Sequence, residues 1–328
     1  MQRNATIKTK AMAPATRFGG VPLAAAEIAF RNALNGEMMG LLQSLPESVH
    51  TDAVILLMEH FGTPFFPAFN YFQNYFAPSW SILYWLEQVA SEGRPKTHLP
   101  PHAPRAHAMA LFLHPLDDHL NDGQLPATHL SLLLRSQAWQ RMNTALERLT
   151  ADVPQGREIV ADLTNAYYDS IEASPAVATL DGYCAHFRKQ MATWMIVPAL
   201  LARYMTPDES FGLDVQAAYG AFGTAWRLMD DLQDREADLA AGCHSAVYYL
   251  LPPAIRGLWD QGPDGRPPAR VRKIREAIRQ EGIVEALQKR ILRELVFAAT
   301  SLDAIQLGGL AQELRCMAAP LADGRAAP

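Results

Sequence analysis

The sequence predicts an all-α protein built as a single antiparallel bundle of helices. Runs that alternate between apolar and polar residues, the pattern of a half-buried strand, are nearly absent. Proline and glycine concentrate in two connections, residues 92–105 and 252–270, where they end helices and permit turns. Elsewhere apolar residues recur every three or four positions, as on one face of a helix; an example is Leu130, Leu133, Leu134, Ala138 and Met142.

This helical periodicity continues through most of the chain. Neither proline-rich connection is long enough to mark a domain boundary, so we expect one domain over residues 21–318. The Ala- and Pro-rich ends, residues 1–20 and 319–328, are expected to form a mobile N-terminal tail and a flexible C-terminal tail. The expected helices cover residues 22–44, 48–61, 67–91, 104–122, 126–149, 156–172, 179–205, 208–235, 238–251, 269–281, 283–305 and 309–318.

Composition excludes several classes of protein. Of the 328 residues, 49% are apolar and 19% are charged, which predicts a globular protein with a large core and excludes a disordered chain. The net charge of -5 and the scattered basic residues predict no nucleic-acid partner. The sequence contains no stretch of about 18 apolar residues and so predicts no transmembrane segment, and the N-terminus lacks the apolar run of a secretory signal. The three cysteines have neither metal-ligand nor redox spacing, which favours a reducing, cytoplasmic setting.

Two segments place clustered carboxylates directly after apolar runs. The first is "DDHLND" (117–122), in which Asp118 and Asp122 are four residues apart, and the second is "RLMDDLQDRE" (227–236), in which Asp230 and Asp234 have the same spacing. Residues four apart share one face of a helix, and like charges that close destabilise it unless a cation lies between them. One such motif alone is often a solvated acidic face, but two copies beside apolar runs favour a functional site.

Both clusters are therefore expected at the rim of an apolar cavity. Hard oxygen ligands without cysteine or histidine suit Mg²⁺, which keeps several waters and commonly bridges carboxylates to substrate phosphates. The combination indicates a substrate with an anionic diphosphate and an apolar remainder.

The motifs resemble the paired aspartate-rich motifs of the class I isoprenoid synthases, an all-helical superfamily of trans-prenyl diphosphate synthases and class I terpene synthases. Residues 222–252 look especially like the second-motif helix and following turn of the prenyl synthase branch. The resemblance implies a bundle with a central apolar cavity, and Mg²⁺-dependent loss of diphosphate from an allylic prenyl diphosphate. By position it implies that Mg²⁺ is bound by Asp117, Asp118 and Asp122 from the first motif and by Asp230 and Asp234 from the second, with Asp231 supporting them or binding through water.

Cations near these motifs are candidates for holding the diphosphate. Residues 183–194 resemble the mid-chain helix that offers a basic residue in this superfamily, and Arg188 is the first choice because its fork matches phosphate oxygens. Lys189 follows it, and the alternative is that the two form a solvated surface pair. Arg227 and Arg235 flank the second motif, where each can bind diphosphate or only offset repulsion between carboxylates.

Aromatic residues close to the charged sites are expected to line the pocket. They are Trp194, Tyr219, Phe222 and Trp226. Phe112 and Leu113 lie one turn before the first motif, where the resemblance implies that side chains set pocket depth. The aromatic stretch 61–88 is expected to be ordinary core, and His114 and His119 are expected to be hydrogen-bonded helix residues.

The sequence also departs from the chain-elongating synthases. It lacks their Gly-Gly-Lys-x-x-Arg stretch near the start and the Arg pair after the first motif, where the first arginine is Arg135. Cys243 stands where their Gly-Lys pair is expected. These cations hold a second diphosphate in the family, and burying such an anion unpaired is costly. The second motif is aspartate-only, unlike the Asn-Ser-Glu type of bacterial terpene cyclases.

One diphosphate site beside an apolar cavity favours a terpene synthase that converts a C10–C20 prenyl diphosphate to a hydrocarbon or alcohol. The alternative is a prenyltransferase that joins the allylic diphosphate to isopentenyl diphosphate or to another acceptor. A further alternative is a non-catalytic partner subunit of a synthase. A homodimer through an apolar helix pair is also an expectation, although no stripe identifies the face.

Overall fold

The computed structural model describes residues 17–91, 98–172, 177–206, 208–261 and 268–322, and within them it contains helices and no strands. The α-helices are α1 (Ala25–Gln43), α2 (His50–Phe61), α3 (Ala77–Ser91), α4 (Ala103–Asn121), α5 (His129–Thr150), α6 (Gly156–Glu172), α7 (Leu180–Gln190), α8 (Ala192–Met205), α9 (Glu209–Ala241), α10 (Ala246–Leu250), α11 (Pro253–Trp259), α12 (Pro268–Gln280), α13 (Ile283–Ala304) and α14 (Gly308–Ala322). Two short 3₁₀ helices, η2 (Glu47–Val49) and η3 (Tyr71–Asn74), precede α2 and α3. The predicted all-α bundle is confirmed.

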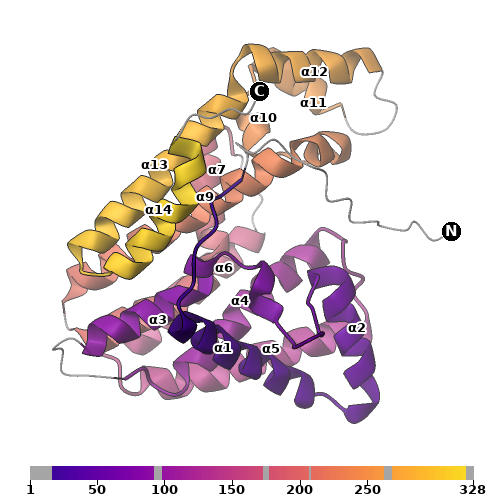
Figure 1. Ribbon diagram of the computed structural model, residues 1–328. Helices are drawn as coiled ribbons and strands as arrows, with labels where there is room; N and C mark the ends of the chain where they lie inside the picture. The colour runs from indigo at the N-terminus through magenta and orange to yellow at the C-terminus, as the bar shows by residue number, and fades with distance from the viewer. Residues whose placement is uncertain (1–16, 92–97, 173–176, 207, 262–267, 323–328) are drawn as a thin grey trace.

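The helices surround one apolar core. The long helix α9 packs against α13, α8 and α7, and α4 packs against α5, α8 and α1. In Figure 1 the C-terminal helices α13 and α14 run side by side along α9, and α11 and α12 lie beyond its far end. No helix in the described ranges is long and apolar enough to cross a membrane. The helices that carry the two aspartate motifs, α4 and α9, thus both belong to the middle of the bundle.

Several predicted helices differ from those observed. The helix expected over 238–251 is reduced to α10, and α11 forms within the connection 252–270, where no helix was expected. The helix expected over 67–91 begins only at Ala77, after the 3₁₀ helix η3 and the extended backbone of Tyr75 (φ -84°, ψ 140°). The helix expected over 179–205 is divided at Met191 into α7 and α8. The second-motif helix, expected to end at residue 235, continues to Ala241 and stops at Gly242 with a positive φ of 82°.

The break at Met191 fits against α9. The Sδ and Cε atoms of Met191 occupy the space in which a Cβ of Gly223 would lie, only 2.0 Å from each atom. Only glycine at position 223 allows this approach, so α9 and the α7–α8 junction come into close contact. Residues on α7 and α8 are thereby brought beside the second motif.

The segment before α1 is packed where it is described. Phe18 is buried and contacts Phe76 edge-on, with ring centroids 5.0 Å apart. The backbone N–H of Gly19 donates to the carbonyl of Met317 in α14. The expected N-terminal tail, residues 1–20, is therefore held at its end, while residues 1–16 lie outside the described ranges. Likewise α14 extends to Ala322, past the expected boundary at 318, and residues 323–328 lie outside those ranges.

A buried carboxyl joins α14 to α3 and α1. The Glu313 carboxyl accepts hydrogen bonds from Ser81 Oγ, at 2.6 Å, and from Trp85 Nε1. Burial raises the pKa of Glu313 to about 8, and a hydrogen bond with the nearby Glu27 carboxyl adds to the rise. At neutral pH the folded protein therefore keeps a proton that the unfolded chain, with a pKa near 4.5, gives up.

This proton predicts a stability that falls as pH rises. The contribution is full below pH 4.5 and is lost through the interval from 4.5 to about 8, because the folded state binds the extra proton there. We expect the melting temperature to drop by a few degrees between pH 5 and 8, and to drop less in Glu313→Gln, whose amide carries no titrating proton. Differential scanning calorimetry at several pH values measures both. Glu147→Gln, at an exposed glutamate of α5, is the control, and an equal drop in Glu313→Gln contradicts the assignment.

Candidate active site

The first aspartate motif lies at the C-terminal end of α4. The helix ends at Asn121, and Gly123 follows with a positive φ of 67°, as expected of a helix stop. Asp118 and Asp122 are exposed on this end, whereas Asp117 is buried with 5% of its surface accessible. The motif thus presents two carboxylates outward and one inward.

The inward carboxylate of Asp117 is fully engaged by neighbouring helices. Arg135 of α5 binds it with both arms of its fork, Nε to Oδ1 at 2.6 Å and Nη2 to Oδ2 at 3.1 Å. The hydroxyl of Tyr167 on α6 donates to Oδ2 at 2.7 Å. This bidentate pair fixes the end of α4 against α5 and α6. Its role as a Mg²⁺ ligand, inferred from the resemblance, stays a prediction that requires Asp117 to share these oxygens.

The second motif on α9 has the same division. Asp231 is buried; it forms an ion pair with Arg227, Nε to Oδ1 at 3.1 Å, and accepts a hydrogen bond from the backbone N–H of Ala246 at 2.9 Å. Tyr183 of α7 accepts from the same Arg227 nitrogen at 2.8 Å and lies against Asp231. Asp230 and Asp234 remain more accessible on the helix surface.

A polar cavity of about 400 Å³ lies at the first motif, and of the segment 227–236 it is Arg227 that lines it, not the second-motif aspartates. Asp118 and Asp122 line it from α4, and Arg227 lines it from α9. The charge of Asp118 raises the pKa of Asp122 on its own helix and also that of Asp230 on α9, so the two motifs are electrostatically coupled. Burial is the larger cause, and together with the neighbouring carboxylates it raises the pKa of Asp230 to about 7, although Arg227 opposes it. The carboxylates hold more negative charge than the nearby side chains neutralise.

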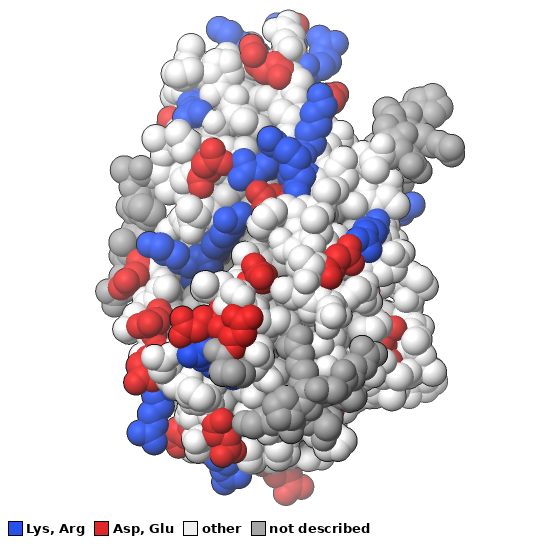
Figure 2. Space-filling view, turned by 90° about the vertical axis from the view of Figure 1, so that its left-hand side faces the viewer, with Lys and Arg blue, Asp and Glu red and all other residues white. Residues whose placement is uncertain are grey.

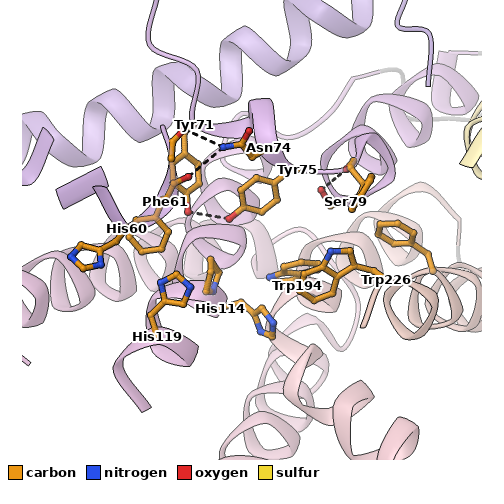
Figure 3. Close-up of a pocket in the computed structure, with 14 residues that line it drawn as sticks. His60, Phe61, Tyr71, Asn74, Tyr75, Ser79, His114, His119, Trp194 and Trp226 are labelled. Carbon is orange, nitrogen blue, oxygen red and sulfur yellow. Dashed lines mark hydrogen bonds between the residues drawn. The ribbon is translucent and has the colours of Figure 1, made fainter. Parts of the chain in front are cut away.

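An apolar cavity of about 360 Å³ lies beside the polar one. Figure 3 shows its aromatic wall, in which Tyr75 faces Trp194 and Trp226, and the Tyr75 and Trp194 ring centroids are 6.5 Å apart. Trp194 and Trp226 also contact each other, with centroids 5.7 Å apart. The other lining residues are His60, Phe61, Gly62, Tyr71, Asn74, Phe76, Ser79, His114, Pro115, His119 and Phe222.

A proline inside α4 shapes this wall. Pro115 has no N–H, so the carbonyl of Leu111, four residues earlier, loses its helical partner. The hydroxyl of Tyr75 donates to that carbonyl at 2.8 Å, and the hydroxyl of Tyr71 lies 3.0 Å from Tyr75. The interruption therefore ties the segment before α3 to α4 at the cavity and positions both tyrosine rings.

Half of the expected pocket residues line the apolar cavity. Trp194, Phe222 and Trp226 do so, as their spacing from the motifs predicted. Phe112 and Leu113 are buried behind the wall, where Phe112 packs against Phe61 and Tyr71. Their neighbours His114 and Pro115 line the cavity instead. Tyr219 is also behind it, and its hydroxyl donates to the Ser79 carbonyl at 2.7 Å.

Several lining residues were not expected. Phe61, Tyr71, Tyr75 and Phe76 come from the aromatic stretch that periodicity alone assigned to ordinary core. Nothing in that stretch reveals the cavity, although proline inside the first-motif run signals a carbonyl in need of a partner. His114 was expected to be an ordinary helix residue and instead borders both cavities.

The expected cations are only partly brought to the polar cavity. Arg227 lines it. Arg188 donates to Thr224 Oγ1 at 2.8 Å and to Glu294 at 3.1 Å, and it does not line the cavity. Lys189 beside it is exposed and lines neither cavity, and Arg235 donates to the backbone carbonyl of Leu232. Roles at a diphosphate for these three residues stay predictions, and Arg188 must leave Glu294 to fulfil one.

One face of the molecule carries a cluster of acidic side chains. Figure 2, which shows the side of the molecule that lies at the left in Figure 1, has acidic side chains gathered near the middle of the face and basic side chains above them.

Within the described part of the chain, no three His, Cys, Asp or Glu side chains are arranged to hold a metal ion by themselves. Any ion bound between the motifs must draw further ligands from water or from a substrate.

No protein-family model matches the sequence, and no curated protein is significantly similar to it. Solved structures do match over nearly the whole chain. Geranylgeranyl pyrophosphate synthase from Lactobacillus brevis is 13% identical, with a TM-score of 0.65, and the match covers 91% of this chain and 97% of that one. Polyprenyl synthase from Caulobacter crescentus, in complex with calcium and isoprenyl diphosphate, is 16% identical, with a TM-score of 0.64, and the match covers 93% of this chain and 100% of that one.

This chain has the isoprenoid synthase fold. Geranylgeranyl pyrophosphate synthetase from Pyrococcus horikoshii, at 10% identity and a TM-score of 0.63, supports the same conclusion, with 88% of this chain and 97% of that one covered. At such low identities the likeness establishes the architecture, which is the fold that the resemblance of the aspartate motifs implied.

Replacing the buried Asp117 and replacing the exposed Asp122 are expected to change the free energy of unfolding by different amounts. Asp117→Ala leaves Arg135 and Tyr167 without a partner and is expected to cost about 2–3 kcal/mol, less than a fully buried pair because Arg135 is one-third exposed. Asp122→Ala removes an exposed carboxylate that is repelled by Asp118, and is expected to change stability by less than about 0.5 kcal/mol. Urea unfolding followed by circular dichroism compares them. Equal losses contradict the division between fixed and accessible carboxylates.

Proposed function

We propose that the protein is a Mg²⁺-dependent enzyme that ionises an allylic prenyl diphosphate and passes the prenyl cation to an acceptor, in the manner of a prenyltransferase. The observation that carries the proposal is the junction of two cavities, one polar and the other apolar and aromatic. The polar cavity is lined by the first-motif carboxylates and by Arg227, and the charge of Asp118 reaches Asp230 of the second motif. The dimensions and polarity of the pair suit a diphosphate joined to a hydrocarbon chain. The prenyl diphosphate synthases that share the fold support the transfer reaction.

The accessible carboxylates fit the metal. Asp118, Asp122, Asp230 and Asp234 are hard oxygen donors, and the raised pKa values of Asp122 and Asp230 reflect burial and negative charge that a cation would offset. Bound Mg²⁺ would neutralise the leaving diphosphate and so favour breaking of the allylic C–O bond. Asp117 and Asp231, fixed by Arg135 and Arg227, hold the two helix ends at the spacing that the site needs.

The aromatic cavity has two tasks in this proposal. It excludes water, which would otherwise capture the carbocation as an alcohol. The faces of Trp194, Trp226 and Tyr75 also stabilise a cation through the ring quadrupole, by about 0.5–2 kcal/mol each.

A second candidate is a terpene synthase, in which the ionised chain rearranges without an acceptor. One specific observation favours it over elongation with isopentenyl diphosphate. Among the described residues that line the polar cavity, Arg227 is the lone arginine or lysine, and its guanidinium is already bonded to Tyr183 and Asp231. A second diphosphate in that cavity would lack fixed cations, so an acceptor for the transfer reaction is best a molecule without a diphosphate.

Substrate assays separate these reactions. The purified chain is incubated with Mg²⁺ and geranyl, farnesyl or geranylgeranyl diphosphate, with and without isopentenyl diphosphate, and diphosphate and organic products are measured. Release that depends on an added acceptor supports transfer, and release with the allylic diphosphate alone supports the terpene synthase. Absence of release in all mixtures contradicts both and leaves a non-catalytic partner of a synthase.

Asp230→Ala should lower diphosphate release at least about 100-fold with the helical content unchanged, because it removes an accessible carboxylate of the metal site. Steady-state assays at several Mg²⁺ concentrations measure the effect. Asp214→Ala, at an exposed aspartate on the same helix far from the motif, is the matched control and should remain within twofold of the wild type. Near-normal release by Asp230→Ala rules out its role.

A further inference from the structure

His114 occupies a singular position. Among the described residues that line the two cavities, it is the one common to both. It lies one turn before Asp118 on α4, at the place where a bound prenyl diphosphate would change from its anionic head to its hydrocarbon chain. The bond that breaks in the proposed reaction lies at this change.

The surroundings of the ring keep His114 neutral. Its imidazole contacts the rings of Trp194 and Trp226 edge-on, with centroids 4.9 and 6.3 Å away. Burial lowers its pKa to about 4, and the charge of Arg227 lowers it further, against smaller opposing effects of Asp117 and of a hydrogen bond to the Gln190 backbone. That hydrogen bond favours the protonated ring, so its partner is the Gln190 carbonyl. One ring nitrogen thus donates to Gln190, and the other is left as an acceptor.

We propose that His114 is the catalytic base that removes the proton ending the carbocation reaction, an inference that rests on the proposed function. In this step a C–H bond next to the cationic carbon breaks and its electron pair forms a C=C bond. The proton passes to the free ring nitrogen, and the imidazolium later returns it to diphosphate or solvent. The step is common to transfer onto an alkene acceptor and to formation of a cyclic or linear hydrocarbon.

A weak base is sufficient for this step. A C–H bond beside a carbocation is far more acidic than any protein side chain, so a neutral imidazole accepts its proton readily. A neutral ring also adds no positive charge next to the cation before the proton moves, whereas a fixed ammonium or guanidinium group would oppose ionisation.

Two hydroxyl groups of the apolar cavity are bonded to backbone carbonyls. The Tyr75 hydroxyl donates to the Leu111 carbonyl, and the Ser79 hydroxyl donates to the Phe76 carbonyl at 2.7 Å. His119 stacks on Phe61, and in Figure 3 it lies with His60 on the opposite side of the cavity from Trp226. Neither of these histidines lines the polar cavity.

The test measures whether the carbocation loses a proton or is captured by water. His114→Phe keeps an aromatic ring in the wall but has no basic nitrogen. The wild type and this variant are assayed with Mg²⁺ and whichever allylic diphosphate and acceptor support release by the wild type. Diphosphate is quantified, and gas chromatography gives the ratio of products that have lost a proton to alcohols formed with water. His129→Phe, at an exposed position of α5, is the control for the same substitution.

We expect His114→Phe to release diphosphate within about tenfold of the wild type and to shift the product ratio at least tenfold toward alcohols. His114→Asn, smaller and also non-basic at neutral pH, should shift the ratio in the same direction and serves if the phenylalanine variant does not fold. An unchanged ratio, or loss of diphosphate release in a folded variant, overturns the role of His114 while the wild-type activity stands. No release by the wild type with any mixture instead contradicts the proposed function, and the inference falls with it.

Discussion

Repulsion between carboxylates on two facing helices is the constraint on which the rest of the structure depends. In each motif one aspartate is buried and paired, and the others are more accessible. The inner aspartate is buried beside an arginine and a tyrosine: Asp117 is bound by Arg135 of α5 and Tyr167 of α6, and Asp231 by Arg227 of its own helix and Tyr183 of α7. The outer aspartates are left without a protein cation sufficient for their charge. The fold thus contributes rigid positions, and in the proposed function a metal ion and its ligands supply the neutralising charge.

Backbone interruptions build the adjoining apolar cavity. Pro115 frees a carbonyl in α4, and the Tyr75 hydroxyl that satisfies it brings an aromatic ring into the wall. The division between α7 and α8 at Met191 relies on Gly223, which lets α9 approach closely. In an uninterrupted bundle these helices would pack on each other's side chains. Departures from ideal helices therefore create the space in which an uncharged substrate chain can lie.

Much of this arrangement could be predicted from the sequence, because helical periodicity and carboxylate spacing are local properties. Asp118 and Asp122, or Asp230 and Asp234, must share a helix face whatever the fold. Trp226 and Phe222 were identified because they lie within two turns of a motif on the same helix. Contacts between different helices could not be predicted from local spacing. The Tyr75 hydroxyl bonds to the carbonyl of Leu111, 36 residues away, and Arg188 bonds to Glu294, 106 residues away.

The most direct test is a crystal structure with Mn²⁺ in place of Mg²⁺ and a non-hydrolysable allylic thiolodiphosphate. Anomalous scattering then locates the metal independently of the protein. The account predicts Mn²⁺ at roughly 2.0–2.2 Å from oxygens of α4 and of α9, with the diphosphate between the two helices and its hydrocarbon chain in the aromatic cavity. Metal on one helix alone, or a hydrocarbon chain lying outside that cavity, would contradict it.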